Sequence, residues 1–60
     1  MDRHALESIA AALWDGGWRV NDLLLEEKDF RKDHGFTYNE ITTIARKLAQ
    51  MEKLEKEEQK

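Results

Sequence analysis

The side chains that could carry out chemistry are spread along the 60-residue chain rather than grouped. Ser8 is interpreted as a small polar residue on the solvated face of a helix, not as a nucleophile. Asp29 and Asp33 are four residues apart, but acid–base catalysis requires a pocket that moves the pKa values of two carboxyls apart. Because so short a chain leaves little volume for an enclosed pocket, we expect no catalytic residues and no enzymatic activity.

Metal and phosphate sites are not expected either. His4 and His34 are far apart in the sequence and do not form the paired-histidine pattern of a metal-binding helix. His34 is expected instead to interact with the last carbonyl groups of a helix, where a histidine complements the helix dipole. Gly16 and Gly17 are not followed by the Lys-Ser/Thr pair of a phosphate-binding loop. The sequence therefore predicts neither a metal nor a cofactor.

The composition narrows the class of protein. The chain has no cysteine, which excludes disulfides and thiolate zinc sites. Its longest apolar run, residues 9–14, is much shorter than the roughly 18 to 20 residues of a membrane span. The first residues carry neither the basic region nor the apolar stretch of a signal peptide. With a net charge of −3, the protein is expected to be soluble, acidic and cytoplasmic.

Helical periodicity and turn residues divide the chain into three predicted helices. The first covers residues 3–15, with Asp2 as its N-cap and Gly16 and Gly17 at its end. Its apolar positions follow helical spacing and are Leu6, Ile9, Ala10 and Leu13. The second is expected to begin at Asn21 or Asp22 and to run to about Asp33, where Gly35 provides the stop signal.

The third predicted helix has the clearest start. Thr37 and Glu40 have the spacing of a capping box, while Phe36 and Ile41 have that of a hydrophobic staple. The helical pattern then continues to about residue 58. We therefore predict an all-α fold, a small three-helix domain with an extended C-terminal helix. Residues 1–51 form its body, and residues 52–60 form a charged end that frays.

A chain of this size buries a small core, so its stability margin is narrow and a partner or a second copy would support it. The leading hypothesis is a non-enzymatic protein–protein interaction module, a regulator or inhibitor of another protein, with self-association as a homodimer as part of the same hypothesis. In size and composition the chain resembles small acidic accessory proteins of phages and bacteria that act on a host protein. The predicted partner-binding residues are Trp14, Trp18, Leu24, Leu25, Met51 and Leu54. The two tryptophans have an alternative interpretation as core residues.

The second hypothesis is a small dimeric DNA-associated transcriptional regulator. Residues 35–41 resemble the first helix of a helix-turn-helix motif in bacterial regulators. A second turn should then follow about ten residues later, but residues 46–51 continue the helical pattern. The basic residues assigned to this alternative are Lys28, Arg31, Lys32, Arg46 and Lys47. Because acidic residues interleave with them and the net charge is −3, nucleic acid is the less favoured partner.

Overall fold

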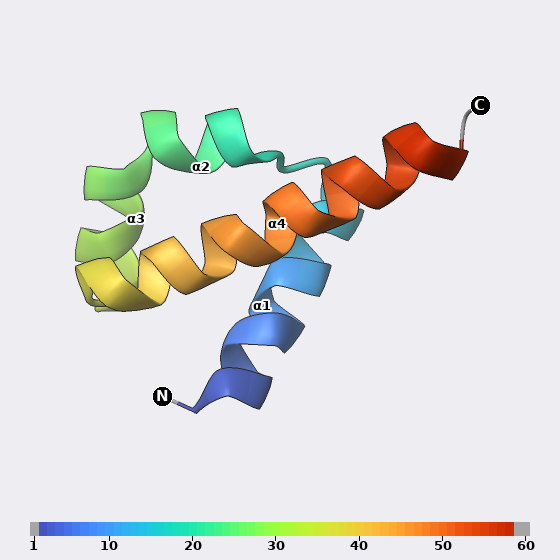
Figure 1. Ribbon diagram of the computed structural model, residues 1–60. Coiled ribbons are helices and arrows are strands. Elements are labelled where there is room, and N and C mark those ends of the chain that lie inside the picture. The colour runs from blue at the N-terminus through green and yellow to red at the C-terminus, as the bar shows by residue number, and fades with distance from the viewer. Residues whose placement is uncertain (1, 59–60) are drawn as a thin grey trace.

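The computed structural model describes residues 2–58, and within that range the chain forms four α helices and no strand. They are α1 (Arg3–Asp15), α2 (Val20–Leu25), α3 (Glu27–His34) and α4 (Tyr38–Glu58). Figure 1 shows α1 crossing beneath the middle of α4, while α2 and α3 form an arm along the other side. The all-α prediction, with its long C-terminal helix, is confirmed.

The predicted helix ends at Asp2, Gly35 and Thr37 are confirmed in detail. The Asp2 carboxylate accepts a hydrogen bond from the Ala5 N–H at 2.8 Å and caps α1. The Thr37 hydroxyl accepts from the Glu40 N–H at 3.2 Å, and the Glu40 carboxylate accepts from the Thr37 N–H at 2.9 Å. Gly35 ends α3 with a left-handed φ of 72°. Local polar side chains thus satisfy the backbone donors at the starts of α1 and α4.

The second predicted helix is divided in two. Glu26, with φ −107° and ψ 16°, leaves helical geometry and separates α2 from α3. Figure 1 shows that α3 then runs in a different direction, which turns it toward the first half of α4. Leu23 is fully buried before the bend and Phe30 is nearly so after it. Burial of these two side chains against the same core outweighs the helical propensity of the residues between them.

The start of α2 also differs from the prediction. The N-cap is Arg19, and neither Asn21 nor Asp22 occupies that position. Asp22 instead lies in the first turn, where its carboxylate accepts a hydrogen bond from the Arg19 N–H at 2.9 Å. The carboxylate of the third helical residue can accept a hydrogen bond from the backbone N–H of the N-cap residue. This bond stabilises a start at Arg19, so the helix begins earlier than predicted.

One hydrophobic core holds the helices together, and each of them contributes to it. Its buried members are Leu6, Ala10, Leu23, Phe30, Ile41, Ile44 and Leu48. An aromatic group extends this core at the end of α3, where the rings of Phe30 and Phe36 stack at 5.5 Å. The Phe30 ring also meets Trp18 edge to face at 5.8 Å. The core therefore reaches from the crossing of α1 and α4 to the α3–α4 turn.

The C-terminal half of α4 extends away from this core (Figure 1). Met51 is half-buried and packs against the core, whereas Leu54 is 51% exposed. The helix is continuous to Glu58, and the predicted fraying over residues 52–60 extends to residues outside the described part of the chain. Among the described helices, none combines the length and the apolar character needed to cross a membrane.

Candidate partner-binding surface

The turn between α1 and α2 connects the two tryptophans, each of which lines a different pocket. Its backbone is fixed by hydrogen bonds from the Gly17 N–H to the Trp14 carbonyl, at 3.0 Å, and from the Trp18 N–H to the Leu13 carbonyl, at 2.9 Å. Gly17 has a φ of 90°, a value that L side chains rarely adopt. The glycine pair thus ends α1 as predicted, with Gly17 in the left-handed conformation.

Arg19 lies across this turn and packs on the first tryptophan. Its guanidinium carbon is 3.6 Å from the centroid of the Trp14 ring, a stacked cation–π contact. The same guanidinium donates hydrogen bonds to the carbonyl oxygens of Trp14, at 3.3 Å, and of Trp18, at 2.9 Å. The Arg19 guanidinium therefore binds groups of the turn itself. Its positive charge lies at the C-terminal end of α1, where it complements the helix dipole.

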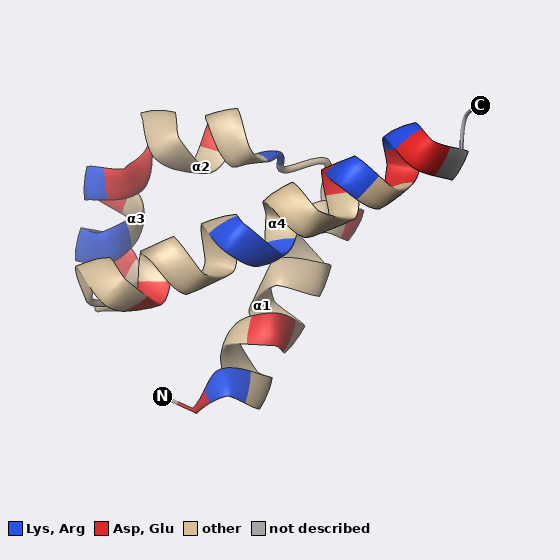
Figure 2. Ribbon diagram, viewed as in Figure 1, with Lys and Arg blue, Asp and Glu red and all other residues tan. Residues whose placement is uncertain are grey.

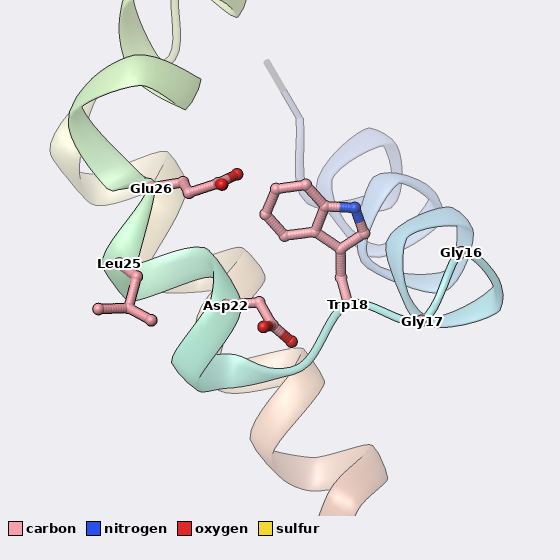
Figure 3. Close-up of a pocket in the computed structure, with 6 residues that line it drawn as sticks. All are labelled: Gly16, Gly17, Trp18, Asp22, Leu25 and Glu26. Atoms are coloured by element: carbon pink, nitrogen blue, oxygen red, sulfur yellow. The ribbon is translucent and has the colours of Figure 1, made fainter.

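Trp18 forms a wall of a shallow pocket of about 270 Å³, here called the Trp18 pocket. The pocket is lined by Gly16, Gly17, Trp18, Asp22, Leu25 and Glu26. Figure 3 shows the carboxylates of Asp22 and Glu26 on the side of α2 that faces the Trp18 ring. A Cβ at position 16 would lie 3.7 Å from the Trp18 ring, an ordinary contact distance. The pocket thus combines an aromatic surface with two carboxylates.

Trp14 lines a second shallow pocket, of about 260 Å³, between α1 and the projecting half of α4. This Trp14 pocket is formed by Trp14, Met51, Leu54 and Glu55. It brings together three of the six predicted partner-binding residues from distant parts of the sequence. A surface depression with three large apolar walls offers a place for an apolar side chain of another protein.

The remaining predicted contacts, Leu24 and Leu25, lie on α2 and are exposed. The exposed fraction is 57% for Leu24 and 85% for Leu25. Leu25 lines the Trp18 pocket, whereas Leu24 lines neither tryptophan pocket. Both tryptophans are half-buried and pack against the core, so each serves as a core residue and as part of the surface. The interpretation of the tryptophans as core residues is therefore supported, and their role in binding a partner stays a prediction.

The five basic residues of the alternative hypothesis lie on two separate helices. Figure 2 shows acidic residues between the lysine and arginine residues of α3. Arg31 is held on α3 by Glu27, whose carboxylate is 3.5 Å away, and by the Tyr38 ring, whose centroid is 5.9 Å from the guanidinium carbon. Lys28 and Lys32 are exposed. The structure therefore does not gather these five side chains in one pocket.

Arg46 and Lys47 line a third pocket, of about 560 Å³, where α1 crosses α4. This basic pocket is formed by Arg3, Leu6, Glu7, Thr43, Arg46, Lys47 and Gln50. Arg3 belongs to it but was not singled out by the sequence, and its guanidinium is 3.6 Å from the Glu7 carboxylate. Only the crossing of two helices places this N-terminal arginine beside residues from the middle of α4.

The structure shows the surroundings of two titratable residues, His34 and Glu40. His34 lies in the last turn of α3, and its ring packs on Phe30 at 4.6 Å. Among residues 2–58, no group of three or more histidine, aspartate or glutamate side chains has the arrangement of a metal site. The hydrogen bond from the Thr37 backbone holds the pKa of Glu40 below its ordinary value of 4.5. That carboxylate belongs to the cap of α4.

Asp22 and Glu26 are the pocket residues that sequence reasoning missed. Asp22 and Glu26 have the four-residue spacing of one helix face, and they follow a tryptophan closely. That spacing was a usable signal, but the bend at Glu26 determines where the second carboxylate lies. Comparison with known proteins gives no further guide, since no family model, curated protein or solved structure matches this chain.

Proposed function

We propose that this protein is a non-enzymatic interaction module that binds another protein, and so regulates or inhibits it. The observation that carries the proposal is the exposure of three leucines, two of which line the two tryptophan pockets. Leu24, Leu25 and Leu54 are between 51% and 85% exposed. Burial of these leucines against a partner would remove apolar surface from water and so stabilise a chain with a small core.

The surface has the composition of a protein-binding site. Tryptophan is enriched among the residues that dominate binding free energies, and it acts from partly buried positions with polar residues around it. Trp14 and Trp18 have such positions, and Glu55, Asp22 and Glu26 border their pockets. We also propose that the Trp14 pocket supports a homodimer, and that the protein works in the cytoplasm.

The proposal is tested by comparing proteins captured from the native host by the wild type with those captured by the variants Leu25→Glu and Leu54→Glu. Each substitution places a charge at an exposed apolar position, so the fold is retained while apolar binding is lost. We expect at least one captured protein to fall about tenfold or more in abundance with one variant, measured by quantitative mass spectrometry.

The matched control is Glu57→Gln, which changes a charge on the exposed end of α4 away from both pockets. It should capture the same proteins as the wild type. Circular dichroism of each variant verifies that helix content is unchanged. Identical capture by the wild type and by both leucine variants would contradict the proposal.

Association with DNA is a second proposal, supported by Arg3, Arg46 and Lys47 around the basic pocket. Binding to phosphates is governed by such charges and weakens steeply with salt. A gel shift at low salt tests it, with alanine at Arg46 and Lys47. Retardation that disappears in the double variant would support this function, and no retardation of the wild type would remove it.

A further inference from the structure

We propose that the Trp18 pocket binds an arginine side chain of the partner protein. The inference rests on the proposed function and specifies the chemistry of one contact in it. It is argued from three properties of the pocket: unneutralised charge, an accessible aromatic ring, and a volume suited to one side chain.

The charge of the pocket is negative and is not balanced from within the chain. Asp22 and Glu26 lie one helical turn apart and both are exposed. In the described part of the chain, the ion pairs are Arg3–Glu7 and Arg31–Glu27, so neither pocket carboxylate has a basic side chain within 4.0 Å. The nearest arginine in sequence, Arg19, is turned onto Trp14. Two neighbouring carboxylates without a counter-charge attract a cation.

The aromatic wall selects arginine among cations. Trp18 is half-buried, with one side packed edge to face on Phe30 and its six-membered ring toward Glu26 (Figure 3). A planar guanidinium can lie over an indole while its N–H groups donate to carboxylates, which a lysine ammonium does less well. The same turn already shows this geometry once, in the stacking of Arg19 on Trp14 at 3.6 Å.

The size of the pocket limits what it can hold. Its volume of about 270 Å³ is below the roughly 300 to 1,000 Å³ typical of pockets for whole small molecules. One long side chain fits that volume better than a complete substrate. Leu25, 85% exposed at the same pocket, would contact an apolar residue next to the arginine. The partner segment is therefore basic and apolar, complementary to an acidic chain of net charge −3.

The direct test is a titration of the ¹⁵N-labelled protein with N-acetyl-arginine amide, followed by nuclear magnetic resonance. We expect saturable shifts of the Trp18 indole N–H and of the Asp22 and Glu26 backbone amides, with an affinity in the millimolar range. The Trp14 indole, already stacked on Arg19, should not shift and is an internal control. N-acetyl-citrulline amide, a neutral molecule of nearly the same shape, should leave all these signals in place.

The variants Asp22→Asn and Glu26→Gln, combined, remove the charge and keep the shape of the pocket. The asparagine side chain retains an oxygen that can accept from the Arg19 N–H, so the start of α2 is preserved. We expect the double variant to bind the arginine probe at least about fivefold more weakly than the wild type. The control pair Asp29→Asn and Asp33→Asn removes two exposed carboxylates from α3 and should bind as the wild type does.

The partner is then tested with the same variants. Capture of the partner protein should fall with the double variant and not with the control pair. Equal shifts from the citrulline probe, or equal arginine binding by the double variant, would overturn the inference while leaving the proposed function standing. Arginine binding without any effect on partner capture would also overturn it. If the arginine comes instead from a second copy of this chain, sedimentation would show a dimer that the double variant dissociates, and the assignment to another protein would be wrong.

Discussion

Gly16 and Gly17 are adjacent and share one turn, yet their backbone conformations make different demands on side chains. Gly16 has a φ of −80°, which any residue can adopt, and a Cβ there would meet its nearest neighbour at 3.5 Å. Gly17 has a φ of 90°, where side chains are strained although the surrounding space is open. The requirement for glycine is therefore conformational and belongs to one position of the two.

Alanine at these two positions should have different effects on stability. We expect Gly17→Ala to lower the free energy of unfolding by about 1 to 2 kcal/mol, because a left-handed backbone disfavours a Cβ. Gly16→Ala should change the free energy of unfolding by less than about 1 kcal/mol. Any change should be stabilising, because alanine lowers the conformational entropy of the unfolded chain and fits the backbone at this position. Urea denaturation of the two variants beside the wild type measures both changes. An equal loss in the two would contradict this view of the turn.

The capping box of α4 should make stability depend on pH. The Thr37 backbone hydrogen bond lowers the pKa of Glu40 in the folded protein. Its stabilising contribution is therefore fully present above the unfolded value, near 4.5, and is lost as the pH falls through the lower folded-state pKa. We expect Glu40→Gln to reduce the fall in unfolding free energy over acidic pH.

Denaturation curves collected between about pH 6 and pH 3 measure this dependence. The control, Glu57→Gln, removes a carboxylate at the other end of α4 and should keep the slope of the wild type. A slope that is the same in Glu40→Gln and in the wild type would show that the cap does not contribute to acid sensitivity.

At the scale of the elements, the bend between α2 and α3 determines which apolar residues are buried. It lets Leu23 and Phe30 both reach the core and leaves Leu25 almost fully exposed. Phe30 contacts Trp18, His34 and Phe36 through its ring. Stability should therefore depend strongly on Phe30, which follows the bend, and weakly on Leu25, which directly precedes it.

Replacement of Phe30 and Leu25 by alanine tests this arrangement. We expect Phe30→Ala to cost about 3 to 5 kcal/mol, enough to unfold much of so small a protein. Leu25→Ala should cost less than about 0.5 kcal/mol, since its side chain is exposed. Thermal unfolding followed by circular dichroism measures the two. A large loss with Leu25→Ala would mean that this leucine is buried in solution.

Local signals explain why much of the fold could be predicted. Asp2, Gly35, Thr37 and Glu40 act on backbone groups within a few residues, so their roles are visible in the sequence. The bend at Glu26 has no such signal, because neither glycine nor proline is present there and tertiary packing imposes it. The sequence therefore predicted one helix where the structure has two.

The candidate surface was less predictable for a related reason. The sequence assigned Leu24, Leu25 and Leu54 to a partner-binding surface, because a helix buries only a limited apolar stripe. All three are exposed in the structure. The pockets were not predicted, since each joins residues from different helices or turns. Arg19 shows the difficulty most clearly, because nothing in the sequence indicates that its side chain packs on Trp14 within the turn.

At the scale of the whole molecule, a single core supports all four helices while the end of α4 extends beyond it. Met51 and Leu54 therefore complete an apolar surface that the rest of the chain leaves partly uncovered. Dimerisation through this surface would couple stability to concentration, because association favours the folded state by mass action.

We expect the melting temperature of the wild type to rise when its concentration is raised tenfold, in line with about 1.4 kcal/mol of association free energy per mole of dimer. Leu54→Glu should melt at a temperature that does not change with concentration. Leu24→Glu, an exposed position outside the Trp14 pocket, is the matched control and should follow the wild type. A concentration-independent melting temperature for all three proteins would exclude the homodimer.

Arg19 has a consequence for the speed and cost of recognition. Its side chain donates to the Trp14 carbonyl in the last turn of α1 and to the Trp18 carbonyl in the turn, while its backbone N–H donates to Asp22 in the first turn of α2. A single residue thereby fastens both helices, and the tryptophans beside it are already oriented before any encounter. A partner would meet a preorganised surface and lose little conformational entropy of this chain on binding. Association should then be limited by diffusion and orientation rather than by rearrangement, with backbone positions in the turn nearly the same before and after.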